Sequence, residues 1–231
     1  MRKTRLPNAR RARPGVDAPE RRRSEGRTER GRQKRERLLD AARTVFERDG
    51  FLHSRISDIC DEAGVPHGSF YTYFASKEEA FEAILDGVEL DLLAVDSLPP
   101  DAGAFTRIRS ANLHYFEAIR DNAAILAVID QVVTFDADAR ATRDRRQQEF
   151  AEALERRTRD YQAQGLADRR LDPAIAARAL GAMVDAVARS IYLRGDPVDV
   201  EVDVVVDQLT MLWVNALGMG ADDGASRSGR A

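Results

Sequence analysis

The chain has 231 residues, 43% of them hydrophobic, which is enough for one or two cores and favours a small domain joined to a larger one. Its single cysteine, Cys60, excludes an internal disulfide framework and a tetrahedral thiolate metal site. No apolar run approaches the length of a membrane span, and no apolar segment follows the basic N-terminal residues. We therefore expect a cytoplasmic protein.

The charge is distributed unevenly along the chain. Residues 1–37 hold 15 of the 36 Lys and Arg but only 5 of the 39 Asp and Glu, so this segment carries +10 in a chain whose net charge is −3. A basic arm on an acidic body indicates a polyanionic partner, although a solvated, disordered tail has the same composition. Charge alone leaves both interpretations open.

Residues 1–31 are rich in Arg, Pro and Gly and almost devoid of large apolar side chains. Such a segment cannot bury enough surface to offset the entropy of folding, so we expect a disordered arm. From Gln33 the pattern becomes helical and it ends at Gly50. The apolar residues of this predicted helix are Leu38, Leu39, Ala42, Val45 and Phe46.

Two short helices around a glycine turn are predicted next. Ser54 is placed to cap the first of them, which ends at Ala63 and Gly64. Pro66 suits the first turn of the second helix. In that helix Phe70 and Phe74 are four residues apart and can face inward together.

The rest of the chain predicts further helices. Ser76 and Glu79 form a capping-box pattern at the start of a long helix, which the run SLPPDAG at 97–103 follows as a break. Beyond it we expect two helices divided near Asp121 and Asn122, and then a long solvated helix at 137–164.

Two more helices are expected near the C-terminal end. Asp172 and Pro173 open a helix with a wide apolar face that ends at Gly195. Residues 198–206 alternate with period two, as a strand would, yet the apolar positions from Val202 onward also fit a helix. We choose the helix, because no second strand exists to pair with this segment.

The segment ISDICDEAGVPHGSFYTYFASKEEAF resembles the signature of the TetR/AcrR family of bacterial transcription regulators. The resemblance covers about residues 34–92, and it departs from the pattern at Cys60 (usually alanine), Phe70 (usually leucine) and His67 (often Lys or Arg). The matching positions are Ala63, Gly64, Val65, Gly68, Tyr71, Tyr73, Phe74, Ser76, Lys77 and Glu78.

The resemblance implies an all-α fold in which an N-terminal three-helix helix-turn-helix DNA-binding domain precedes a larger helical ligand-binding and dimerisation domain. We place the first domain at residues 32–78 and the second at 79–218, between the basic arm and a flexible tail at 219–231. The last two helices, 172–195 and 199–218, are expected to pair with their copies in a homodimer. Such a dimer reads an inverted-repeat operator in double-stranded DNA.

By similarity, the second short helix is the recognition helix in the major groove, where small residues allow close approach and polar residues meet bases or phosphates. Phosphate contacts are expected from Tyr71, Tyr73 and Lys77. Without the surrounding pattern, the tyrosines would be taken as half-buried and Lys77 as a solvated helix start. The predicted DNA-binding residues are Ser54, Arg55, His67, Gly68, Ser69, Tyr71, Thr72, Tyr73 and Lys77.

The resemblance also implies a repressor that releases its operator when a small-molecule effector favours another spacing of the recognition helices. The apolar lining suggests a lipophilic effector, a hypothesis that a pocket full of polar contacts would contradict. Aromatic and methionine residues at helical spacing are more often core than pocket. The candidate pocket residues are Leu113, Tyr115, Phe116, Ile119, Leu126, Met183 and Trp213.

The sequence bears on two other classes of function. An enzyme needs a nucleophile with a base or a metal cluster, and the sequence has no GxSxG elbow, phosphate loop or HExxH pair. The three histidines, His53, His67 and His114, show no ligand spacing, so we expect no catalytic residue, metal or cofactor. The remaining alternative is a nonspecific nucleic-acid-binding or adaptor protein that binds through the basic arm.

Overall fold

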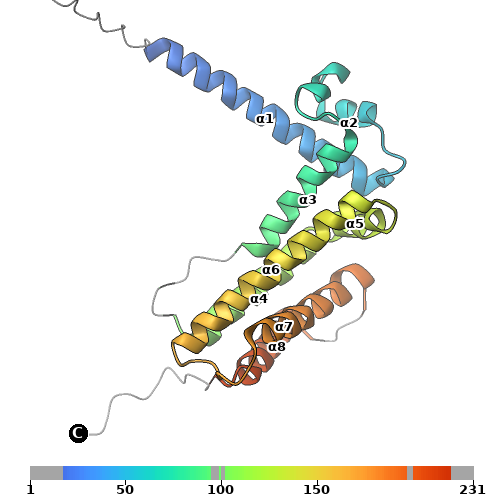
Figure 1. Cartoon of the computed structure of the whole chain (residues 1–231). Helices are drawn as coiled ribbons and strands as arrows, with labels where there is room; N and C mark the ends of the chain where they lie inside the picture. The colour runs from blue at the N-terminus through green and yellow to red at the C-terminus, as the bar shows by residue number, and fades with distance from the viewer. Residues whose placement is uncertain (1–17, 95–98, 100–101, 197–199, 220–231) are drawn as a thin grey trace, which may run out of the picture.

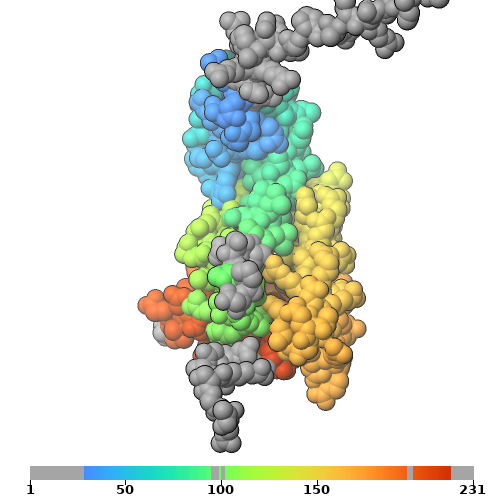
Figure 2. Space-filling model, turned by 90° about the vertical axis from the view of Figure 1, so that its left-hand side faces the viewer, coloured from blue at the N-terminus to red at the C-terminus, as the bar shows by residue number. Residues whose placement is uncertain are grey.

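The computed structural model describes residues 18–94, 99, 102–196 and 200–219, and of residues 18–28 it describes the backbone alone. All regular structure in this part of the chain is helical, which confirms the predicted all-α fold. The N-terminal helices form one end of an elongated molecule, and the later helices pack together at the other end (Figures 1 and 2). Within the described ranges no helix is both long and apolar enough to cross a bilayer.

Helix α1 (Ala18–Asp49) ends as predicted at Gly50, whose φ of 76° is in the left-handed region. It begins earlier than predicted, so residues 18–31 of the expected disordered arm are helical, while residues 1–17 lie outside the described residues. The physical reason is that Arg and Glu favour a helix even without an apolar face. Arg32 pairs with Glu29 at 2.7 Å and with Glu36 at 3.1 Å on this surface.

The glycine turn separates α2 (Ile56–Ala63) from η1 (His67–Thr72), which is a short 3-10 helix. Gly64 ends α2 with a φ of 63°. The prediction that Ser54 caps α2 is wrong, because Arg55 is the capping residue and its backbone N–H donates to Asp58 Oδ2 at 3.0 Å.

Helix α3 (Lys77–Leu93) joins the two ends of the molecule (Figure 1). It begins as predicted, since the Ser76 hydroxyl accepts from Glu79 N at 3.2 Å. Near its start, Phe81 meets Phe46 and Phe51 with ring centroids 5.7 and 4.8 Å apart. These three rings form the core on which α1 and α3 cross.

The far end of the molecule is built from α4 (Ala104–Asp121), α5 (Ala123–Phe135) and α6 (Ala137–Ala163) together with the last helices. The division between α4 and α5 falls at Asn122, as predicted. Only Ala139 and Thr158 are buried in α6, which confirms a largely solvated helix.

Helix α7 (Pro173–Arg189) packs along α6, and η2 (Ser190–Arg194), a π-helical turn, carries it to Gly195. Helix α8 (Val202–Ala216) packs against α4, which confirms the helix over the strand for this segment. Met219, predicted as the first residue of the flexible tail, is buried; residues 220–231 lie outside the described residues.

A polar joint connects α1 to the far end of the molecule. Arg43 donates from Nη1 to Asn122 Oδ1 at 2.8 Å and from Nη2 to the Asp121 carbonyl at 3.1 Å. Asn122 is only 4% exposed and donates in turn to Asp91 Oδ2 at 2.8 Å. His114 reaches the Asp91 carbonyl at 2.8 Å, so the joint links α1, α3 and the start of α5.

Candidate nucleic-acid interface and ligand cavity

Helix η1 presents a polar surface on a rigid aromatic base. Phe70 is fully buried and its ring lies 5.5 Å from that of Phe74, as the spacing predicted. Tyr71, the next residue, is 55% exposed. The other exposed residues of η1 are His67, Gly68 and Thr72.

The remaining predicted DNA-binding residues differ in their accessibility. Arg55 is exposed at the start of α2, whereas Ser69 and Tyr73 are half-buried and Tyr73 packs against the core. Ser54 is 4% exposed and its hydroxyl donates to the Phe51 carbonyl at 2.8 Å. A buried hydroxyl that is already bonded cannot contact DNA in this arrangement, so Ser54 is a structural residue of the turn before α2.

Lys77 also faces the protein. Its ammonium donates to the Phe51 carbonyl at 2.7 Å and to the Ser54 carbonyl at 3.1 Å, and it lies 4.4 Å from the Phe51 ring centroid. Burial lowers the pKa of this ammonium. Two of its three N–H donors are used inside the protein, so Lys77 stabilises the α1–α2 turn and has one N–H donor left for a phosphate.

Two arginines of α1 that the sequence pattern did not single out hold η1 and α2 in place. The Arg35 guanidinium lies 5.0 Å from the Phe74 ring centroid, and Arg37 donates to the Ala63 carbonyl at 2.8 Å. No sequence pattern indicates these contacts, because both arginines lie on the polar side of α1. The carbonyl that Arg37 reaches is 26 residues away in the chain. Cys60 of α2 also contacts η1, since its Sγ lies 3.7 Å from the His67 carbonyl oxygen.

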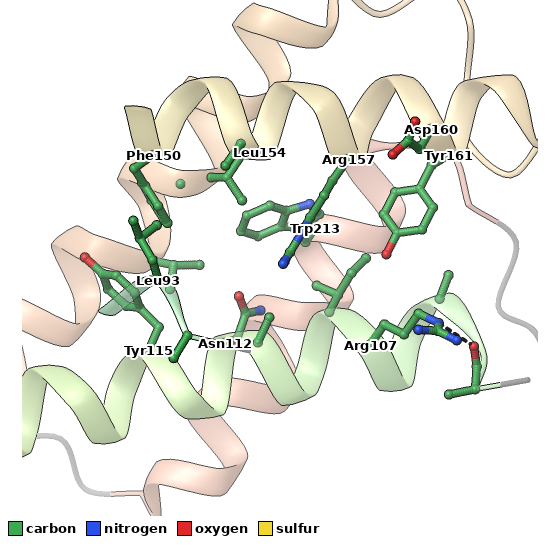
Figure 3. A pocket seen from close by; sticks show the side chains of 18 of the residues that line it. Leu93, Arg107, Asn112, Tyr115, Phe150, Leu154, Arg157, Asp160, Tyr161 and Trp213 are labelled. Carbon is green, nitrogen blue, oxygen red and sulfur yellow. Dashed lines mark hydrogen bonds between the residues drawn. The ribbon is translucent and has the colours of Figure 1, made fainter. Parts of the chain in front are cut away.

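A cavity of about 600 Å³ lies among α3, α4, α6, α7 and α8. Figure 3 shows Tyr115 and Phe150 at one end, Trp213 near the middle, and Tyr161 and Arg107 at the other end. The volume is in the range of about 300–1,000 Å³ that is typical of small-molecule sites. The chain therefore contains a site large enough for a small organic ligand.

A second cavity of about 400 Å³ lies behind the stacked pair of Tyr115 and Phe150, whose ring centroids are 5.9 Å apart. Its lining is strongly charged. The Tyr115 hydroxyl donates to Asp185 Oδ1 at 2.7 Å, and Asp185 also accepts from Arg189 at 2.8 Å. Burial raises the pKa of Glu89 in the same wall.

Three of the predicted pocket residues line these cavities. Tyr115 borders both, Trp213 the larger and Leu126 the smaller. The other four, Leu113, Phe116, Ile119 and Met183, line neither cavity and pack in or against the core. The larger cavity also has polar lining residues that the prediction missed, namely Arg107, Asn112, Arg157, Asp160, Tyr161 and Gln164. The expectation of an apolar lining is therefore corrected to an amphipathic one.

Helices α7 and α8 expose apolar side chains. On α7, Ile175 is 70% exposed, and Ala179, Ala182 and Ala186 continue the same side at helical spacing. On α8 the exposed apolar residues are Val204, Met211 and Leu212. Exposed apolar residues gathered on two neighbouring helices are typical of an interaction surface.

Comparison with known proteins identifies similar sequences for part of the chain. The profile described as "Bacterial regulatory proteins, tetR family" matches residues 38–84. The HTH-type transcriptional repressor KstR2 of Mycobacterium tuberculosis (strain ATCC 25618 / H37Rv) is 34% identical over 109 residues, which are 46% of this chain and 51% of that protein. The uncharacterised HTH-type transcriptional regulator YfiR of Bacillus subtilis (strain 168) is 34% identical over 93 residues, 40% of this chain and 45% of that protein.

The chain spans about half the length of these curated relatives. Similar folds cover more of it. The structure of GusR from Salmonella enterica has a TM-score of 0.66 at 22% identity, covering 80% of this chain and 96% of that one. The fatty acid degradation regulator FadR from Bacillus halodurans has a TM-score of 0.62 at 18% identity, covering 80% and 97%. At this identity the two structures show a shared fold.

Proposed function

The chain belongs to the TetR family of bacterial regulatory proteins, and we propose from this that it represses transcription by binding an inverted-repeat operator as a homodimer. The family consists of regulators rather than enzymes. The observation that carries the proposal is η1, which exposes polar and aromatic side chains on a base of buried phenylalanines. A short rigid helix with this division fits a major groove.

Fewer residues are proposed to contact DNA than the sequence alone suggested. His67, Gly68, Tyr71 and Thr72 are exposed on η1, and Arg55 is exposed at the start of α2. We assign base or groove contacts to the first two and phosphate contacts to Tyr71 and Arg55. The basic residues of α1 and of the N-terminal arm add attraction to the phosphate backbone that salt weakens.

Gly68→Ala tests close approach to DNA without disturbing the fold. A Cβ at Gly68 would meet no atom within 4 Å, and its φ is outside the left-handed region, so the melting temperature should not fall. If η1 lies in the groove, the added methyl lowers operator affinity about tenfold, by crowding the contact. The operator is first selected from a random duplex pool, and affinity is then measured by fluorescence anisotropy.

The matched control is Gly87→Ala on α3, where a Cβ also meets nothing within 4 Å. This variant should bind the operator like the unchanged protein. Equal affinities for both variants would contradict the placement of η1 in the groove. Failure to select any inverted repeat would favour the alternative in which the basic arm binds nucleic acid without sequence preference.

We propose that the exposed apolar sides of α7 and α8 form the dimer interface. In Met211→Glu, symmetry places one carboxylate from each subunit in the apolar interface, so sedimentation velocity should show a monomer where the unchanged chain is a dimer. Met211 is 48% exposed in the single chain, so the substitution should leave the fold intact. Leu90→Glu is the control, because Leu90 is 67% exposed on α3, and a monomer there would move the interface elsewhere.

The larger cavity is proposed as the effector site. An effector that binds the DNA-incompetent arrangement better than the DNA-bound one lowers operator affinity by the ratio of its two affinities. The polar joint through Arg43 connects the cavity-bearing helices to α1. We place the boundary between the two functions in α3, whose Phe81 packs on Phe46 and whose last residues line the cavity.

A further inference from the structure

The larger cavity has two chemically different regions. Apolar side chains from four helices line it, among them Ile108, Leu154, Val184 and Trp213. Polar side chains reach it from α4 and α6, and Figure 3 shows Arg157 extending from α6 across the cavity toward Asn112. The cavity is therefore shaped for a ligand with one polar and one apolar part.

The charges that face this cavity are unbalanced. Its lining contains two cations, Arg107 and Arg157, and one carboxylate, Asp160. Arg107 is anchored to the backbone carbonyls of Pro99 and Ala102, at 2.8 and 2.9 Å. Among the residues that the structure describes, Arg157 has neither an ion pair nor a hydrogen bond. The cavity thus presents a guanidinium whose donors are available to a ligand.

Neutral donors lie beside this guanidinium. The Tyr161 hydroxyl can donate a hydrogen bond, and burial raises its pKa further above neutral. Asn112 is 4% exposed, and its amide donates to Thr210 Oγ1 at 3.1 Å, which fixes the side chain at the cavity wall. Asn112 is thus held in place before a ligand arrives, which lowers the entropic cost of binding.

We infer that the effector of this cavity is an anionic amphiphile, namely a carboxylate that Arg157 and Tyr161 bind, with a hydrocarbon body that packs against Trp213. This inference rests on the proposed function, whose effector site it specifies. A guanidinium binds a carboxylate through two parallel N–H···O bonds, and it offers no acceptor to an ammonium group. The same cavity should therefore distinguish ligands of equal length by the charge of the head group.

The chain carries its own reporter for this test, because Trp213 lines the cavity and is the single tryptophan in the sequence. Dodecanoate, 1-dodecanol and dodecylamine are titrated below their aggregation limits while the tryptophan emission is followed. A hydrogen bond to a charged group corresponds to about tenfold or more in affinity. Dodecanoate should therefore bind at least about tenfold more tightly than the alcohol, and the amine more weakly than either.

Arg157→Gln should remove the preference for dodecanoate over the alcohol while the alcohol binds as before, because the apolar wall is unchanged. Arg156→Gln is the control, since Arg156 is exposed on the same helix and does not line the cavity. Equal binding of the three probes, no binding of dodecanoate, or a preference that survives Arg157→Gln would each overturn the inference. Selection of an operator by the same protein tests the proposed function separately, so the two failures are distinguishable.

Discussion

Phe70→Ala should lower the free energy of unfolding by about 3–5 kcal/mol and abolish operator binding. The side chain is fully buried, and its ring meets that of Phe74 beneath η1, so truncation leaves a cavity under the recognition helix. Such a loss is a large part of the stability of a small domain. Denaturant unfolding followed by circular dichroism measures it, and anisotropy with the selected operator measures binding.

The neighbouring substitution, Tyr71→Ala, gives the opposite combination. Tyr71 is 55% exposed, so its removal should hardly change the unfolding midpoint. Operator affinity should nevertheless fall about tenfold or more through the loss of the proposed phosphate contact. A variant that loses stability as Phe70→Ala does, or that keeps full affinity, would show that Tyr71 belongs to the core or faces away from DNA.

Arg43→Ala should weaken the protein at the joint between its two ends. The substitution removes both hydrogen bonds to the α4–α5 junction and leaves Asn122 Oδ1 without the Arg43 donor in a side chain that is 4% exposed. An unsatisfied buried polar group costs about 1–3 kcal/mol. Thermal unfolding should show this loss, and operator affinity should fall severalfold, because the two recognition helices of the dimer are held less firmly.

Arg48→Ala is the matched comparison, with the same substitution on the same helix. Arg48 pairs with Asp49 at 2.9 Å and with Glu62 at 3.2 Å, both on the surface of the N-terminal domain. Surface ion pairs contribute little, so neither stability nor operator affinity should change measurably. If both arginine variants behave alike, the joint does not hold α1 in its DNA-binding position.

Much of the fold followed from local signals in the sequence. Gly50, Gly64 and Gly195 end helices as predicted, and Asp172 with Pro173 opens α7. These signals are local, since a left-handed glycine or a capping side chain acts within one turn of its own helix. The strand-like alternation before Leu209 was resolved correctly because a lone strand has no partner.

The sequence was least informative where contacts between residues distant in the chain determine the position of a side chain. Ser54 has the side chain of a capping residue, yet the turn after α1 buries it and leaves the cap to Arg55. The signature also gives no indication that the Lys77 ammonium is bonded to carbonyls more than 20 residues earlier in the chain. The start of α1 was missed because an arginine- and glutamate-rich helix has no apolar face.

The cavity was the least predictable feature. Helical spacing indicates which side chains face inward, but it does not distinguish an inward side chain that meets another from one that borders empty space. Phe116 and Ile119, for example, were predicted to line a pocket, but both are fully buried core residues. Arg157 lies on the polar helix α6, where no pattern in the sequence indicates that an arginine turns toward a cavity.

Helix α1 also acts as a lever. Its 32 residues make a rod about 48 Å long at 1.5 Å per residue, held near its C-terminal end by the joint at Arg43. The segment from Ala18 to Arg43 spans about 38 Å, so a tilt of about 5° at the joint moves the first turn by about 3 Å. This displacement is comparable with the rise of about 3.4 Å per nucleotide along the DNA helix axis. A tilt of a few degrees at this joint would thus shift the basic end of α1 by about one base-pair step along a duplex.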